Sequence, residues 1–206
     1  RELNLDKSLV TTTYKINNVS YKKEVFISYP DQAMVVRISS DQAEKITCTA
    51  ELTSLLNHKI DIDKTELVLN GQAPLHAYPH YLGEIDPLYE DGKGMKFQIR
   101  LQVIHSGGRS GIEDGVYKIL NANAVEFRLV AATGFNGYEN DPATDGKDFA
   151  AICESRIDAN NSFTYKKLLK RHTEDYSKLF GRVSLDLGKD INQDIPLDQR
   201  IVNYSK

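Results

Sequence analysis

The ten residues MKFQIRLQVI (95–104) alternate strictly between apolar and polar side chains. Apolar residues recur at every second position, which is the period of a β-strand with one buried face. We expect the odd positions to face a core and the even ones to face water, namely Met95, Phe97, Ile99, Leu101 and Val103 against Lys96, Gln98, Arg100 and Gln102. This stretch predicts a sheet with a single buried face.

The same period recurs on both sides of that strand. LVTTTYKI (9–16) and VSYKKEVFISY (19–29) are predicted strands, joined by Asn17-Asn18, a pair that tolerates the positive φ of a tight hairpin. Further strands are expected over 33–39, 45–52, 116–120 and 124–131, with a turn at Gly107-Gly108. Each strand is expected to place a set of residues on one face: Val10, Thr12, Tyr14 and Ile16; Val19, Tyr21, Val25, Ile27 and Tyr29; Met34, Val36 and Ile38, which are expected to face inward; and Ile46, Cys48, Ala50 and Leu52. Short strands separated by turns predict a mainly β fold, a two-sheet antiparallel β-sandwich.

The pattern changes after Thr133. A loop leads to predicted helices near 147–158 and 164–180, and a return strand follows the second helix. The first helix has its apolar residues at Phe149, Ile152, Cys153 and Ile157. The second carries a stripe of Tyr165, Leu168, Leu169, His172, Tyr176, Leu179 and Phe180, and Gly181 is its expected C-cap. The helices follow the strands rather than alternate with them, which excludes a βαβ design.

Composition excludes several classes of partner. The 206 residues are 40% apolar and 27% charged, with a net charge of −3. Lys and Arg are scattered among Asp and Glu, so no nucleic acid partner is expected. No run approaches the ~18 apolar residues of a membrane span. Cys48 and Cys153 lack metal-ligand spacing and are expected to be buried thiols.

His172 and Asp175 are a candidate catalytic pair, since residues three apart are neighbours on a helix. A nucleophile would also be required, and no Gly-x-Ser-x-Gly or catalytic Cys motif is present. His172 also lies inside the apolar stripe. We therefore expect a packed, hydrogen-bonded histidine and assign no catalytic residue.

No metal or cofactor site is predicted. Asp141, Asp145 and Asp148 lack the spacing of a calcium loop, so a solvated acidic turn with a helix N-cap at Asp145 is expected. The glycines 107, 108 and 111 do not match a phosphate-binding loop, and a hairpin turn accounts for them.

The irregular insert GQAPLHAYPHYLGEIDPLYEDGKG (71–94) is rich in Tyr, Pro and His. Its candidate binding residues are Tyr78, His80 and Tyr81, because aromatic faces suit the apolar faces of pyranose rings. Such loops also pack on the edge of a sandwich without binding anything. Both interpretations remain open at the level of sequence.

Several segments together resemble glycoside hydrolase family 95, the inverting α-L-fucosidases. The segment HTEDYSKLFGRVSLDLG (172–188) is similar to that family's linker. Similar strand motifs are YPDQAMVVRISS (29–40), MKFQIRLQVIHSGG (95–108) and NAVEFRLVAATGFNGY (123–138). DIPLDQRI (194–201) is similar to the segment leading into the catalytic domain, with departures at Leu197 and Gln199. The family's Trp- and Gly-rich opening is absent.

The resemblance implies a supersandwich-type N-terminal domain over 1–140 and a helical linker with its return strand over 141–206. In the family, an (α/α)6 barrel follows and supplies the catalytic residues. We therefore expect a truncated, inactive part of a fucosidase that acts on fucosylated glycans, with the missing barrel as its partner. Self-association through an exposed linker face and a secreted or periplasmic location are further expectations. His172, Asp175 and Arg182 would then form a polar latch.

A second hypothesis comes from another class of protein. The chain could be a stand-alone carbohydrate-binding or adhesin-type β-sandwich. That function requires an exposed aromatic platform, which is best sought among residues 78–89.

Overall fold

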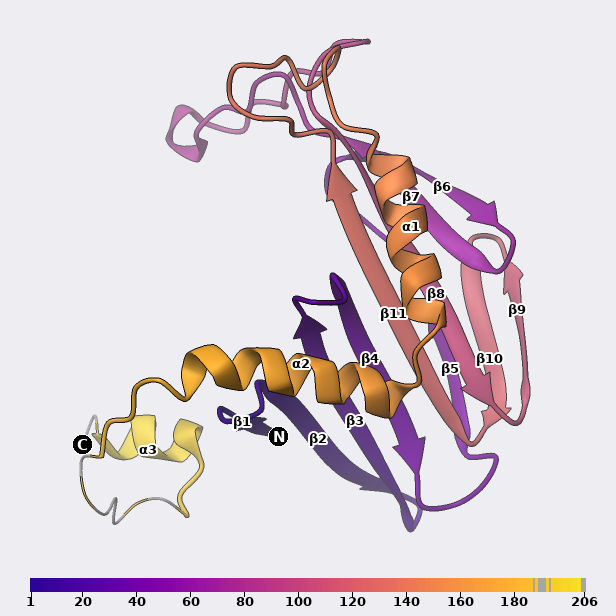
Figure 1. Cartoon of the computed structure of the whole chain (residues 1–206), viewed down its shortest axis with the longest axis vertical. Helices are drawn as coiled ribbons and strands as arrows, with labels where there is room; N and C mark the ends of the chain where they lie inside the picture. Colours follow the sequence, from indigo (N-terminus) through magenta and orange to yellow (C-terminus); the bar gives the residue numbers. More distant parts are fainter. Residues whose placement is uncertain (187, 189–191, 193, 205–206) are drawn as a thin grey trace.

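The computed structural model describes residues 1–186, 188, 192 and 194–204. Its strands are β1 (Glu2–Asn4), β2 (Leu9–Ile16), β3 (Val19–Ser28), β4 (Ala33–Ser40), β5 (Ile46–Ala50), β6 (Asn57–Asp63), β7 (Glu66–Gln72), β8 (Lys96–Ser106), β9 (Arg109–Glu113), β10 (Val116–Ala122) and β11 (Ala124–Thr133). Its helices are η1 (His80–Leu82), α1 (Phe149–Asn161), α2 (Tyr165–Phe180) and α3 (Leu197–Tyr204). Among these residues the strands form an eight-stranded sheet, β1-β2-β3-β4-β11-β8-β7-β6, and a three-stranded sheet, β5-β10-β9 (Figure 1). All pairings are antiparallel, which confirms the predicted sandwich.

The core of the sandwich lies between the two sheets. Ile46 and Ile119 of the small sheet pack with Leu67, Leu101 and Val125 of the large sheet. Cys48, Ala50 and Leu52 join this cluster, as the alternation around them predicted. The small sheet is much narrower than the large one, so this core covers only part of the large sheet's inner face.

Helices α1 and α2 lie on the opposite face of the large sheet (Figure 1). Cys153 and Ile157 of α1 pack on Ala33 and Val130. Leu168 of α2 packs on the large sheet separately, in a cluster with Leu9, Phe26 and Val35. The molecule therefore has three layers: small sheet, large sheet and helices.

The helix layer overturns part of the expected strand orientation. Gln98 and Arg100 were expected to face water, but both are buried. Arg100 donates to Gln98 Oε1 at 2.9 Å and to Asp63 at 2.8 Å, and Cys153 of α1 contacts the Gln98 carbonyl at 3.5 Å. Alternation shows that a strand has two different faces, but it does not show that a helix covers the polar one.

Strand β4 shows the same effect. Met34, Val36 and Ile38 were expected to be the inward residues, yet all three are only half-buried. The fully buried residues are Ala33 and Val35, which face the helices. Both faces of this strand are apolar because both are covered.

The predicted turns form as expected. Asn17 and Asn18 have φ values of 48° and 63°, and Gly107 and Gly108 both have 67°. At Gly108 an added Cβ would lie 2.2 Å from the Leu120 carbonyl oxygen, so this position requires glycine. Cys48 and Cys153 are free thiols, as predicted, but only Cys153 is buried, because Cys48 is half-buried.

Both predicted helices are present, with one difference at a cap. The N-cap of α1 is Asp148, whose Oδ1 accepts from the Ala151 amide at 3.0 Å, and not Asp145. Asp145 instead belongs to the preceding acidic turn, where its amide donates to the Asp141 carbonyl at 2.8 Å. Gly181 is the C-cap of α2, as predicted.

Six elements of the described chain were not predicted: β1, the β6–β7 hairpin, η1, β9 and α3. The predicted return strand after α2 is absent over 183–186, where the chain is irregular, and its next residue, Leu187, lies outside the described residues. No neighbouring strand of the described chain lies alongside 183–186 to accept its hydrogen bonds. No helix in the described part of the chain is long and apolar enough to cross a membrane.

Candidate functional site

Helix α2 divides into a buried half and an exposed half. Thr164 caps its start, and Leu168 is completely buried against the large sheet. Toward the other end, Leu179 and Phe180 are 62% and 43% exposed. The helix runs beyond the edge of the large sheet toward α3 (Figure 1). Phe180, although it belongs to the predicted apolar stripe, is therefore not buried in this chain.

His172 fastens the buried half of α2 to the start of the chain. Its Nε2 lies 3.0 Å from the Lys7 carbonyl oxygen and 3.1 Å from that of Ser8, so Nε2 carries the proton and donates. The imidazole also stacks on Phe26 at 5.0 Å between ring centroids. A nitrogen that donates to carbonyl oxygens is not poised as a general base, which agrees with the predicted structural role.

The predicted polar latch does not form as a unit. His172 bonds to the β1–β2 turn, whereas Arg182 Nε donates to the Lys178 carbonyl at 2.9 Å. Within the described residues, Asp175 makes no hydrogen bond or ion pair with either. His172 and Arg182 are ten positions apart in the sequence, and Arg182 lies beyond the end of α2 at Phe180, too far for one side chain to reach the other.

Exposed apolar residues continue beyond α2. Val183 and Leu185 are each 81% exposed. Helix α3 adds Leu197, Ile201, Val202 and Tyr204, with exposures from 56% to 94%. We call the described residues between 176 and 204 the helical arm. Inside it, Tyr176 and Phe180 stack with their ring centroids 5.1 Å apart.

The predicted binding residues Tyr78, His80 and Tyr81 lie in the loop between β7 and β8, at one end of the sandwich (Figure 1). Tyr81 is 76% exposed and Tyr78 39%. Each ring meets a histidine edge-on: His76 contacts Tyr78 at 4.6 Å and His80 contacts Tyr81 at 6.3 Å between centroids. The loop thus offers separate exposed rings but no pair of parallel rings.

A charged cavity lies where α2 begins, with a volume of about 810 Å³. Its two acidic side chains, Glu24 and Glu126, are both ion-paired: Glu126 to Arg128 Nε at 2.7 Å and Glu24 to Lys22 at 2.6 Å. Burial raises the pKa of the Tyr165 hydroxyl, and nearby Glu24 raises it further. These carboxylates are neutralised by cations, which suits a structural network better than acid–base chemistry.

Arg128 is the centre of that network. It is 3% exposed, and its guanidinium donates to the carbonyls of Asn160 and, at 2.8 Å, Phe163. These carbonyls belong to the end of α1 and the turn before α2. The arginine therefore holds the corner between the two helices against β11.

Comparison with known proteins now identifies the sandwich. Residues 1–138 match the family described as "Glycosyl hydrolase family 65, N-terminal domain". The chain belongs to this family. Residues 164–206 match a second family, "Glycosyl hydrolase family 95 catalytic domain", from the N-cap of α2 onward.

Two curated relatives of this glycosyl hydrolase domain carry fucosidase names. The chain is 28% identical to "Alpha-L-fucosidase 2" of Arabidopsis thaliana, over 95% of the chain and 24% of the relative. It is also 28% identical to "Probable alpha-fucosidase A" of Aspergillus oryzae, over 91% of the chain and 25% of the relative. The chain thus spans about a quarter of the length of these relatives.

A solved structure shares the fold of this family 65-type domain. "Putative kojibiose phosphorylase from human microbiome" superposes with a TM-score of 0.55 at 12% identity, over 86% of the chain and 24% of that protein. Together with the family matches, these relatives make the chain a glycoside hydrolase family 65/95-like N-terminal domain, in agreement with the resemblance seen in the sequence. Helix α1 falls between the two matched ranges, so the predicted boundary near residue 140 stays a prediction.

Proposed function

We propose that the chain is the non-catalytic N-terminal domain of an α-L-fucosidase-like glycoside hydrolase. The whole enzyme would act on fucosylated glycans by inverting hydrolysis and would be secreted or periplasmic. The names of the two curated relatives support the substrate class. The proposal assigns the chemistry to a catalytic barrel and assigns no catalytic residue to this chain.

The helical arm is the observation that carries the proposal. Helix α2 is anchored to the sheet before the arm begins, by the buried Leu168 and His172, while Leu179, Phe180, Val183 and Leu185 of the arm are exposed. A contiguous exposed apolar surface is typical of an interface. This surface lies inside the range that matches a catalytic-domain family, so a catalytic barrel of the same polypeptide is the proposed partner.

The proposal is tested first by association of the chain itself. Without a barrel, the arm should bring copies together at high concentration, since the exposed side chains gain by leaving water. Sedimentation velocity should show a mass that rises with concentration, and L179D combined with F180D should restore a monomer. The matched control K170D changes an exposed residue in the same helix and should leave association unchanged.

The second test uses a protein that carries this chain together with its catalytic barrel. L179D with F180D should lower both its melting temperature and its fucosidase activity, because charges would enter the proposed interface. K170D should lower neither. Two results together would contradict the docking role. The chain alone would stay monomeric at all concentrations, and L179D with F180D would change neither the melting temperature nor the activity of the protein that carries the barrel.

A further inference from the structure

The small sheet covers the inner face of the large sheet only in part. Strand register places five apolar residues of β2, β3 and β4 on the same side as Ile38, which packs against the core between the sheets. They are Val10, Val25, Ile27, Met34 and Val36. In the described part of the chain, none of the five belongs to a core cluster, and Ile27 is 67% exposed. We call these five residues the open inner face.

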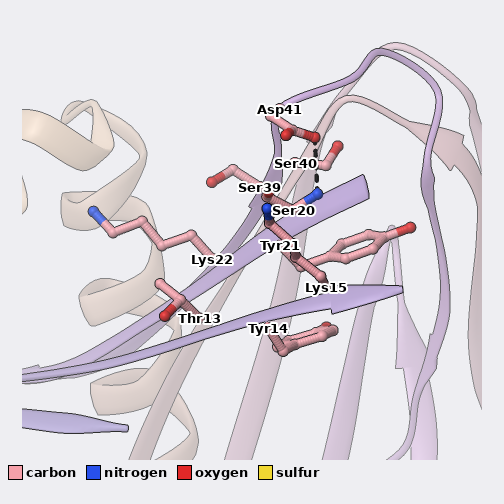
Figure 2. Close-up of a pocket in the computed structure, with 9 residues that line it drawn as sticks. All are labelled: Thr13, Tyr14, Lys15, Ser20, Tyr21, Lys22, Ser39, Ser40 and Asp41. Atoms are coloured by element: carbon pink, nitrogen blue, oxygen red, sulfur yellow. Dashed lines mark hydrogen bonds between the residues drawn. The ribbon is translucent and has the colours of Figure 1, made fainter. Parts of the chain in front are cut away.

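Two tyrosines continue the open inner face toward the β2–β3 hairpin. Tyr14 and Tyr21 stack across the two strands, with ring centroids 5.2 Å apart. Figure 2 shows both rings on one side of β3, whereas Thr13 and Lys22 point to the other side. The Tyr21 hydroxyl donates at 3.1 Å to the carbonyl of Lys45, the residue before β5. Strand β5 therefore begins beside this face.

Strand β5 has a free edge that points toward the open inner face. Within the described residues, β5 pairs only with β10, and β9 is the opposite edge of the small sheet. The β9–β10 turn lies over β6, since a Cβ added at Gly115 would be 3.7 Å from Ile60 Cγ2. The small sheet thus runs from β6 on one side to β4 on the other. A strand added at β5 would continue it over β3 and β2.

The composition of β5 differs from that of the other sheet edges. Exposed edges of soluble proteins commonly carry charged residues, which oppose pairing with a further strand. The other three edge strands of the described chain carry them: Glu2 in β1, Lys59, Asp61 and Asp63 in β6, and Arg109 and Glu113 in β9. Strand β5 is ITCTA (46–50) and carries none. An uncharged edge beside an exposed apolar face is suited to receive a strand.

One charged side chain interrupts this apolar surface. Lys23 lies between Thr12 and Ile38 in the register of the large sheet, and it makes no ion pair within the described residues. Covering its ammonium group with a strand would cost free energy unless the strand supplied an opposite charge. The fitting partner is therefore a strand with apolar residues at alternate positions and an Asp or Glu opposite Lys23.

We propose that a β-strand of the same polypeptide, from outside residues 1–206, adds to the free edge of β5 and covers the open inner face. Its apolar residues pack on Val25, Ile27 and Met34, and its acidic residue pairs with Lys23. The curated relatives match this chain over about a quarter of their length, which leaves ample sequence to supply a strand. The inference rests on the proposed function only in requiring a whole protein longer than this chain.

Hydrogen exchange of the β5 amides tests the proposal. It is measured in the chain alone and in the whole polypeptide that carries the chain. Amides on the outer edge of β5 should exchange at least about tenfold more slowly in the whole polypeptide, because they become hydrogen-bonded there. The outer edge of β6 is charged and is the internal control. Its amides should exchange at the same rate in both proteins.

Ile27→Asp gives a second measurement on the same pair of proteins. Because Ile27 is 67% exposed in the chain, the substitution should hardly change the melting temperature of the chain alone. It should lower the melting temperature of the whole polypeptide, in which the added strand covers this side chain. Ile62→Asp is the matched control on β6, where Ile62 is 54% exposed, and it should have the same effect in both proteins.

Equal exchange of β5 in the two proteins would overturn the proposal, and so would an equal effect of Ile27→Asp. Exchange at β5 that slows with concentration in the chain alone would also overturn it, because the strand would then come from a second copy. The proposed function has separate readouts. A whole polypeptide that releases fucose and responds to L179D with F180D, but leaves β5 open, would keep that function and reject the added strand.

Discussion

Asp41 gives the β2–β3 corner a defined pH dependence. Hydrogen bonding to Ser20 lowers its pKa below the usual 3.8, so the folded value lies below the unfolded one. Its contribution to stability is present above pH 3.8 and is lost as the pH falls through the folded pKa. The Ser20 amide resonance should therefore titrate with a midpoint below 3.8. D41N should abolish that titration, and a midpoint at or above 3.8 would contradict the hydrogen-bond geometry.

Leu168 and Phe180 should differ in their effect on stability, although both belong to the predicted stripe of α2. Leu168→Ala empties a fully buried position and should lower the free energy of unfolding by about 2–5 kcal/mol. Phe180 is 43% exposed and packs mainly on Tyr176, so Phe180→Ala should cost no more than about 1 kcal/mol. Lys170→Ala should cost less than about 0.5 kcal/mol. Urea denaturation of the three variants measures this, and equal losses for Leu168 and Phe180 would refute the division of α2.

At the scale of elements, Arg128 fixes the corner between α1 and α2. Arg128→Met keeps most of the volume but removes every donor to Asn160 and Phe163 and leaves Glu126 without its 2.7 Å partner. Breaking a buried pair by removing one partner typically costs about 3–5 kcal/mol. We expect a loss of that size, together with faster amide exchange across residues 160–165. A variant as stable as the parent would show that the corner is held by apolar packing alone.

The sequence predicts elements well where a local signal is sufficient. Asn17-Asn18 and Gly107-Gly108 mark turns by their own backbone preferences, and the helical spacing from Tyr165 onward is unambiguous. The sequence predicts the burial of side chains less well, because burial depends on which other elements pack on a strand or helix. Gln98 and Arg100 look solvent-facing until α1 covers them, and Phe180 looks buried although α2 extends past the sheet.

The candidate sites, like burial, depend on which residues the fold brings together. Tyr78 and Tyr81 attract notice because they cluster in the sequence, but their rings are not parallel. Tyr14 and Tyr21 form a stacked pair, and they belong to different strands. Their expected orientation on one face was a usable signal, since a hairpin at Asn17-Asn18 places these residues opposite each other.

At the scale of the whole molecule, the sandwich and the helical arm differ in how much of their apolar surface is buried. The sandwich is closed by a core between its sheets, whereas the helical arm leaves apolar residues exposed. The family matches divide the chain in a similar way, with an N-terminal-domain family over 1–138 and a catalytic-domain family over 164–206. This division is what the proposed function requires, namely a domain that positions a catalytic barrel without sharing in its chemistry.

Release of L-fucose from a fucosylated oligosaccharide by the chain alone tests this account most directly. Inverting hydrolysis requires two carboxyl groups about 6.5–9.5 Å apart, one of them free to donate a proton, whereas Glu24 and Glu126 are both ion-paired. The account predicts no fucose above the buffer background, under conditions in which an active α-L-fucosidase consumes the same substrate. Turnover by the chain that disappears in E24Q or E126Q would contradict it.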